Sequence, residues 1–305
     1  MIFRCFATVV VLIGFGLFAF SCVRSVKGGP TAIDQMENGD RTTFVDNLPD
    51  DFEFPTNAAG DLLFREYGAV FLARNGAVPP NKVFFENELE VLLFQNAVGY
   101  ESEKLSGVNI ELQKPAIRDL ENAVKQAKKE GLTISPRGAD SGRRGYSQTI
   151  ALWKSRVEPG LTYWVGKGRL KAPQAELIRR MPIREQINEI LSLEKDGIFF
   201  AKSLDKSIIY SVAPPGSSQH IAMLAFDVKE FDDARVRSIL SQNGWFQTVT
   251  SDLPHFTYIG VEESELPGLG LKKIHSNDRD FWVPDLDPAK PIKRPKDNKL
   301  GPKGR

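Results

Sequence analysis

Apolar residues recur at helical spacing in two stretches of the chain. In the first, they fall at intervals of three, four and three residues: Ile117, Leu120, Val124 and Ala127. This spacing places them on one face of a helix over 115–130, which Gly131 ends. The second stretch has a similar spacing: Ile183, Ile187, Ile190 and Leu191. It predicts an amphipathic helix that is ended by Gly197.

Weaker patterns predict further helices. Apolar residues return between 61 and 100, which indicates one or two helices ahead of the rest of the domain. The segment Tyr146–Trp153 is expected to be helical, and Ala234–Asn243 is expected to form a short helix closed by Gly244. By contrast, residues 155–172 are rich in Gly, Lys and Arg and show no strong period.

Short apolar runs bounded by turn-forming residues predict strands. They are 132–137, followed by a turn; 197–201 and 207–212, on either side of a turn; the buried run 222–228; and a hairpin-like pair, 245–250 and 255–259, joined at Asp252–Pro254. Strands that pair with their neighbours, with helices between them, predict an α+β domain. We expect an antiparallel sheet with flanking helices.

The N-terminus has the composition of an export signal. Arg4 gives a positive start, and 6–20 is an uncharged apolar run, which is typical of a signal peptide over residues 1–22 and less typical of a single membrane anchor. Ala19-Phe-Ser-Cys22 is similar to a bacterial lipoprotein box, although the usual Leu is missing. Lipidation of Cys22 and simple cleavage nearby both remain open. The expected location is the periplasm or cell envelope. The alternative is attachment to the membrane, through a lipid on Cys22 or through an N-terminal anchor.

Composition divides the rest of the chain into three parts. Residues 23–57 are polar and are expected to form a tether. The domain is expected over 58–283, with an insertion at about 157–212 that edges or covers the cleft. Residues 284–305 are rich in Pro and Lys and are expected to be a disordered basic tail.

Length, charge and cysteine content narrow the function. With 305 residues, 41% apolar residues and a net charge of +1, the chain can build a core and has no basic stripe of the kind that nucleic acids require. Nucleic acid is therefore not an expected partner. Cys5 and Cys22 are the only cysteines, and both belong to the signal. The domain therefore offers no disulfide, no cysteine zinc ligand and no thiol nucleophile.

Two of the three histidines stand at positions suited to a metal site. His220 precedes Asp227 by seven residues, and His255 follows on a separate strand-like run. Two neutral imidazoles and one carboxylate are a standard donor set for catalytic zinc, which leaves the fourth position for water. The third histidine, His275, has no partner at such a spacing and is given no role.

The residues around this donor set resemble a known peptidase family. The pattern is a serine two before the first histidine, a small-apolar run into the aspartate, a Gly-Trp pair, and a carboxylate three before the last histidine: Ser218, His220, Asp227, Gly244, Trp245, Asp252 and His255. It is similar to the pattern of the zinc D-Ala-D-Ala carboxypeptidases and dipeptidases, which include the vancomycin-resistance peptidases. The resemblance covers about 110–259, interrupted by the insertion, and implies the Hedgehog/D,D-peptidase-like zinc peptidase fold.

Carried over one position at a time, the resemblance implies roles for these residues. The two histidines and Asp227 fall on the zinc ligands, and Ser218 falls on a polar residue that contacts the substrate. Asp252 stands where the family has the glutamate general base, and its side chain is one methylene shorter, about 1.5 Å. If Asp252 is too short, Glu262 or Glu263 is the fallback carboxylate.

The upstream part of the family pattern is an arginine after a short strand, followed by a helix that contains glutamine. Here the strand is 132–137 and the helix carries Gln148, the expected second substrate contact. Arg137 is expected to bind the substrate carbonyl or carboxylate, because a guanidinium offers paired donors that a lysine cannot reproduce. Arg143 and Arg144 compete for this role, since Arg143 has the family's spacing to Gln148.

These features lead to the expectation of an exported zinc metallopeptidase. Zinc lowers the pKa of its bound water toward about 7, Asp252 would pass the water's proton to the leaving amine, and Arg137 would stabilise the oxyanion. The expected substrate is the peptidoglycan stem peptide, cleaved as by a D-Ala-D-Ala carboxypeptidase. Two alternatives stay open: a non-catalytic cell-wall-binding lipoprotein that keeps the fold, and a structural surface lipoprotein in which the His-Asp-His frame is accidental.

Overall fold

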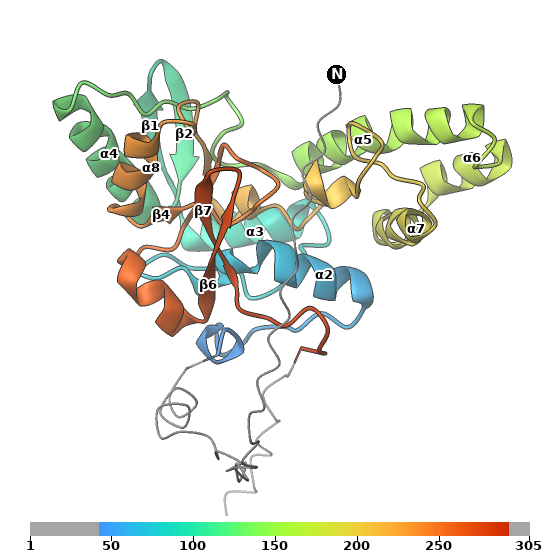
Figure 1. Cartoon of the computed structure of the whole chain (residues 1–305), viewed down its shortest axis with the longest axis horizontal. Coiled ribbons are helices and arrows are strands. Elements are labelled where there is room, and N and C mark those ends of the chain that lie inside the picture. The colour runs from blue at the N-terminus through green and yellow to red at the C-terminus, as the bar shows by residue number, and fades with distance from the viewer. Residues whose placement is uncertain (1–42, 293–305) are drawn as a thin grey trace, which may run out of the picture. The chain divides into compact units, whose positions relative to one another are not determined.

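The computed structural model describes residues 43–292, which belong to one compact unit (Figure 1). Its α-helices are α2 (Ala58–Tyr67), α3 (Glu88–Val98), α4 (Lys114–Lys129), α5 (Tyr146–Gly166), α6 (Ala172–Arg180), α7 (Ile183–Lys195) and α8 (Ala234–Ser241). Its strands are β1 (Glu101–Leu105), β2 (Val108–Leu112), β3 (Ala225–Asp227), β4 (Trp245–Phe246), β5 (His255–Tyr258), β6 (Leu271–Ser276) and β7 (Arg279–Pro284). The expected signal sequence with Cys22, and residues 293–305, lie outside this range.

A small antiparallel sheet has the strand order β3-β5-β4. Its strands β4 and β5 fall within the hairpin-like pair expected at 245–259. Asp227 pairs with His255, and Phe226 pairs with Phe256. Because side chains alternate between the two faces of a strand, the first pair faces one side of the sheet and the second pair faces the other. Phe226 packs with Trp245 into the core. One face of the sheet therefore belongs to the core, and the other carries the candidate metal ligands.

Two further hairpins, β1–β2 and β6–β7, were not expected from the sequence. Each closes through two residues with positive φ, Ser106-Gly107 in the first and Asn277-Asp278 in the second. Such turns match the twist of an antiparallel pair. The strands beside them are largely exposed, so the hydrophobic alternation that signals a strand is weak.

The helices expected from apolar spacing are confirmed. They are α4, α7 and α8, together with α2 and α3 in the region 61–100. Gly244 follows α8 with a φ of +76°, as expected for the residue that closes a helix. The helix expected at Tyr146–Trp153 is present but continues to Gly166, and α6 was not expected at all.

The prediction of strands at 197–201 and 207–212 is wrong. Neither segment pairs in a sheet, and Ile208–Tyr210 is a 3₁₀ turn, η3. Their apolar residues, such as Phe200 and Ile208, are fully buried in the main core. Continuous burial gives the same run of apolar residues as a buried strand, so the pattern cannot tell the two apart.

The segment 132–137 is extended, but it is not a strand of the sheet. It makes a single bridge between Pro136 and Val228, and the Arg137 N–H donates to the Asp227 carbonyl at 3.0 Å. Proline has no N–H to continue a ladder. The segment nevertheless lies beside β3, where it brings Arg137 to the site face.

The expected tether ends earlier than residue 57, which is a correction to its boundary. Phe44 and Phe52 are buried, and both pack against Phe64 of α2. The domain therefore includes the described residues from 43 onward, because apolar side chains of this otherwise polar segment belong to its core. At the other end, Arg65 donates to the backbone carbonyls of Asp287 and Lys290, so the first residues of the expected tail also contact the domain.

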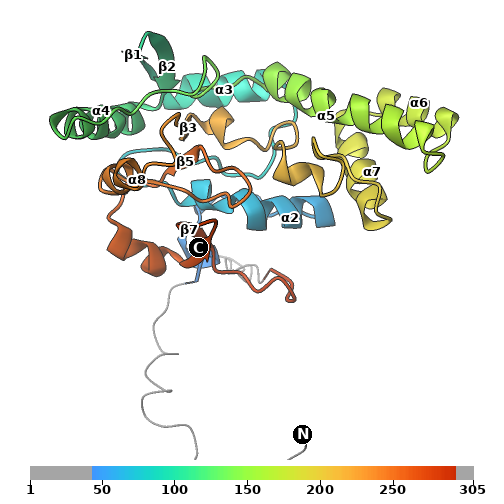
Figure 2. The same ribbon diagram turned by 45° about the horizontal axis from the view of Figure 1, so that its top comes forward.

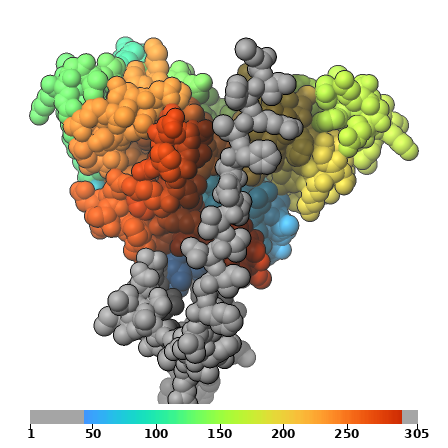
Figure 3. All heavy atoms as spheres, in the orientation of Figure 1, coloured from blue at the N-terminus to red at the C-terminus, as the bar shows by residue number. Residues whose placement is uncertain are grey.

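Helices α5, α6 and α7 form the part of the domain that corresponds to the expected insertion. α3 contacts α5, α6 contacts both α5 and α7, and α7 contacts α2. Figure 2 shows α3, α5 and α6 along one edge of the domain with α7 below them. Figure 3 shows the surface of α6 apart from the orange C-terminal elements. None of the helices between residues 43 and 292 is long and apolar enough to span a membrane.

Candidate metal centre

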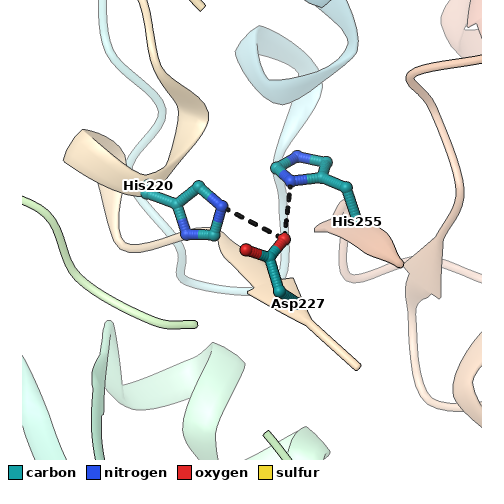
Figure 4. A group of neighbouring side chains, drawn as sticks. All are labelled: His220, Asp227 and His255. Carbon is teal, nitrogen blue, oxygen red and sulfur yellow. Dashed lines mark hydrogen bonds and ion pairs between the residues drawn. The ribbon is translucent and has the colours of Figure 1, made fainter. Parts of the chain in front are cut away.

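Three side chains with metal-binding atoms meet beside strands β3 and β5 (Figure 4). Asp227 ends β3, and His255, which begins β5, is its partner across the ladder. His220 comes from the 3₁₀ turn η4 (Gln219–Ala222). One atom of each side chain lies within 4.8 Å of the corresponding atoms of the other two. The three residues that the sequence singled out as a donor set therefore lie together in the structure.

The turn that carries His220 is fixed by its neighbours. Gly216 has a φ of +82°, and a Cβ there would lie 2.0 Å from the carbonyl oxygen of Phe85, so only glycine fits this approach. The buried amides of Gln95 and Gln113 donate to backbone carbonyls of η4. These contacts leave the turn little freedom and set the direction of the imidazole.

His220 is held in one tautomer. Its Nδ1 lies 2.7 Å from the Gly142 carbonyl oxygen, which can only accept, so Nδ1 carries the proton. Its Nε2 then carries a lone pair, and this nitrogen lies 3.4 Å from the Asp227 carboxylate. This Nε2 is buried and has no hydrogen-bond partner among the described residues. A buried nitrogen without a partner is costly unless a ligand satisfies it.

His255 is held in the opposite tautomer. Its Nε2 lies 2.8 Å from Gln219 Oε1, and the Gln219 amide nitrogen donates to the Tyr67 carbonyl, also at 2.8 Å. The amide is therefore oriented with its oxygen toward His255, and that oxygen also accepts from the Thr257 hydroxyl. Nε2 is thus the protonated nitrogen, and the Nδ1 lone pair faces Asp227 Oδ1 at 3.2 Å.

Three lone pairs therefore converge on one point with no proton among them. Two imidazole nitrogens and a carboxylate oxygen repel one another in this arrangement unless a cation lies between them. Each histidine donates its other N–H to an oxygen acceptor, which is the second layer of contacts that zinc-ligating histidines ordinarily have. The donor set and its protonation states fit zinc, with room for a water or substrate atom as the fourth ligand.

The charge of the cluster is set by burial and by Arg144. Burial, followed by the charge of Arg144, lowers the pKa of His220. Burial alone would raise the pKa of Asp227, but charge interactions and hydrogen bonds with the protonated forms of His220 and His255 outweigh burial and keep that pKa well below its ordinary value. Arg144 donates to Asp227 Oδ2 at 2.8 Å and to the Asp140 carbonyl at 3.0 Å. A neutral histidine and an ionised aspartate are the states that metal binding requires.

A cavity of about 470 Å³ opens over these three side chains. Its volume lies within the usual range for ligand sites. Three residues expected from the sequence also line it: Arg137, Ser218 and Asp252. Arg137 and Asp252 are exposed to solvent, whereas Ser218 is buried. The backbone N–H of His255 donates to the Asp252 carbonyl at 3.1 Å, which ties the turn that carries Asp252 to the candidate metal centre.

Other expected site residues lie elsewhere. Gln148 is exposed, accepts from the Gly145 N–H at the start of α5, and does not line the cavity. Its residue type suits a helix cap as well as a substrate contact, which is why the sequence misplaced it. Arg143 donates to Glu111 and Gln95, so it is engaged outside the cavity.

The fallback carboxylates are also remote from the cavity. Glu263 accepts from Lys273 and Trp282, and Glu262 lines a different cavity beside Asp119. Asp252 is thus the expected base that remains at the site.

Sequence reasoning missed the residues that orient the ligands. Arg144 was considered only as a substrate contact, and Gln219 and Gly142 were not considered. Gln219 stands next to His220, so its position was a usable signal. The carbonyl of Gly142 has no side-chain signature, and nothing in the sequence points to it.

Comparisons with known proteins give one weak likeness. No family model and no curated protein matches the chain. Among solved structures, it is similar to a mutant of the vancomycin-resistance D,D-pentapeptidase VanY, from a VanB-type resistance cassette, in complex with Zn(II). The sequence identity is 17%, the TM-score is 0.32, and the match covers 54% of this chain and 82% of the other. Such a score does not establish a common fold, so the functional assignment rests on the site itself.

Proposed function

We propose that this protein is an exported zinc metallopeptidase that hydrolyses D-amino-acid-containing peptide bonds of peptidoglycan stems, in the manner of a D-Ala-D-Ala carboxypeptidase. The observation that carries the proposal is the convergence of three lone pairs, from His220, Asp227 and His255, beside a cavity. The proposed location is the periplasm or cell envelope. It is supported by the apolar N-terminal run and not by the described residues.

The residues around the cavity suit amide hydrolysis. A bound zinc ion would supply Lewis-acid activation of water and of the scissile carbonyl. Asp252, on the turn that ends at His255, would accept a proton and pass it to the leaving amine. Arg137 has no side-chain hydrogen bond within 43–292, so its guanidinium is available to a substrate carboxylate or an oxyanion. Ser218 offers a hydroxyl from the wall of the cavity.

The substrate class is supported by the sequence pattern. The family that the Ser218-to-His255 pattern resembles acts on D-Ala-D-Ala peptides, and an exported enzyme of that kind meets peptidoglycan. A specific feature favours a second candidate, a metal-holding cell-wall-binding protein without turnover. The feature is the shorter Asp252 in place of glutamate. Turnover separates the two candidates.

The test combines metal content and turnover. Purified protein prepared without chelator should carry about one zinc ion per chain. Asp252→Asn should keep that zinc and lose roughly 10²–10⁴ in turnover of stem peptides, the usual contribution of a general base. Asp252→Glu should retain activity, since it restores the longer carboxylate. The matched control is Glu262→Gln, which removes a carboxylate away from the cavity and should leave turnover unchanged.

Two results would contradict the proposal. Protein that takes up no zinc would remove the metal centre. Zinc-loaded wild-type protein that binds stem peptides without cleaving them would favour the non-catalytic alternative.

A further inference from the structure

The cavity extends from the metal centre to a wall built by the insertion. Arg156 of α5, and Tyr210 and Ser211 at η3, line it together with the metal-binding histidines. Tyr210 and Ser211 belong to the insertion at about 157–212, and Arg156 stands immediately before it. This wall of the cavity therefore depends on this chain's own insertion.

Arg156 is held in place but keeps free donors. Its Nε donates to Ser211 Oγ at 2.9 Å, and its Nη1 donates to Ser155 Oγ at 2.8 Å. A guanidinium has five N–H groups, so three remain without a partner among the described residues. Ser211 Oγ also accepts from the Lys202 N–H at 3.3 Å, so its own hydroxyl proton is free to be donated.

Arg156 has no carboxylate partner within the described range, unlike Arg144 and Arg179. Arg144 pairs with Asp227, and Arg179 of α6 pairs with Glu158 and Glu176. A partly buried guanidinium that is positioned by hydroxyls and left uncompensated is suited to an anionic ligand.

The geometry of α5 limits where that anion lies. Ten residues separate Tyr146 at the helix start from Arg156, a rise of about 15 Å. Helical side chains lean toward the N-terminus, which brings the guanidinium back toward the start of the helix. Arg144, which holds Asp227, stands just before that start. Since an extended peptide spans about 3.3–3.6 Å per residue, Arg156 reaches a group within about four residues of the metal centre.

We propose that Arg156 and Ser211 form an anion subsite that binds a carboxylate of the substrate peptide, within four residues of the bond that is cut. The proposal rests on the proposed function for the identity of the peptide. It assigns this wall of the cavity a role in specificity. The subsite selects stems whose γ-linked D-glutamate keeps a free α-carboxylate over stems in which that carboxylate is amidated.

Binding to a matched pair of peptides tests the subsite. The probes are L-Ala-γ-D-Glu-L-Lys-D-Ala-D-Ala and the same peptide with an α-carboxamide on the glutamate. Calorimetric titration uses zinc-loaded protein with Asp252→Asn, and mass spectrometry checks that each peptide stays intact. We expect the free carboxylate to bind about tenfold more tightly or better, as for a hydrogen-bonded charge. Arg156→Gln should abolish the difference, and Arg156→Lys should keep part of it, because a lysine retains the charge but not the fork.

The control is Arg169→Gln, on the exposed segment between α5 and α6 and outside the cavity, which should leave the ratio of the two affinities unchanged. Equal binding of the two peptides by the unaltered subsite would overturn the proposal. So would an Arg156→Gln protein that still discriminates, or one that loses affinity for both peptides equally, which is the result expected if Arg156 only ties α5 to Ser211. Absence of hydrolysis by wild-type protein contradicts the proposed function but leaves this binding ratio as a separate result.

Discussion

At the residue scale, the candidate site depends on which nitrogen of each histidine carries its proton. Gly142 fixes the proton of His220 on Nδ1, and Gln219 fixes that of His255 on Nε2. The sequence could point to the candidate ligands because residue type and spacing suggest them. It could not predict these acceptors, since a backbone carbonyl and an amide orientation are set by the fold.

Arg144 provides a test of this outer layer. Because its guanidinium holds Asp227 Oδ2 at 2.8 Å, Arg144→Gln should weaken zinc binding by about 10–100-fold, the usual effect of such a partner. Competition with a chelating dye measures the change. Arg137→Gln is the control, because the Arg137 side chain makes no bond to the cluster in the described structure. Equal zinc affinities for Arg144→Gln and wild type would show that Asp227 needs no such support.

Glu194 of α7 provides a pH-dependent test. Burial raises its pKa above the ordinary value of 4.5, although hydrogen bonds from Ser207, Ile208 and Phe200 oppose the shift. A raised folded-state pKa means that the folded protein holds the proton more tightly than the unfolded chain. The stability that this gives is fully present below the unfolded pKa and is lost as pH rises through the folded pKa.

Glu194→Gln carries no such titration. Its free energy of unfolding should therefore improve relative to wild type as pH rises from about 4.5 to 7. Urea denaturation at several pH values measures the difference, with Glu185→Gln on the exposed side of α7 as the control. A difference between Glu194→Gln and wild type that stays constant with pH would contradict the assignment.

At the scale of elements, α5 shows where sequence patterns fail. The helix continues through Pro159 and Gly160, two residues that ordinarily interrupt helices. Its inner face is nevertheless buried at Val157, Gly160 and Leu161, so tertiary packing outweighs local preference. The pattern of α4 was readable because its outer face is charged, whereas α5 has no such contrast.

Gly160 gives the corresponding prediction. A Cβ there would lie 2.5 Å from Cδ1 of Phe200, which is fully buried. Gly160→Ala should therefore destabilise the protein by about 1–3 kcal/mol through overpacking, although alanine favours a helix by about 1 kcal/mol. Gly166→Ala, in the same helix with no atom within 4 Å of the added Cβ, should be neutral or stabilising. Thermal unfolding of the pair measures both signs, and stabilisation by Gly160→Ala would show that α5 does not pack closely on Phe200.

At the scale of the whole molecule, the fold class was predictable and the cavity was not. Strand pairing and helical periodicity led to an α+β domain, and β3, β5 and α8 lie where the pattern placed them. The cavity, however, is lined by Tyr67 and by some residues of four separate segments, 137–156, 209–213, 218–227 and 249–255. Its shape depends on contacts between segments far apart in the chain, such as the Tyr67 hydroxyl with the Ile209 carbonyl at 2.5 Å. Local patterns carry no information on such contacts.

A metal that joins a sheet to a 3₁₀ turn should also stabilise the whole domain. His220 lies on η4, whereas Asp227 and His255 lie on the sheet, so the unfolded chain lacks a preformed site. At free zinc about 1,000-fold above Kd, binding adds about 4 kcal/mol, which for a domain of this size raises Tm by about 8–16 °C. Calorimetry with zinc and with EDTA measures the shift. His220→Ala should unfold at the same temperature in both conditions, while Arg137→Gln should respond as wild type does. An equal zinc response from His220→Ala would place the stabilising metal away from these three residues.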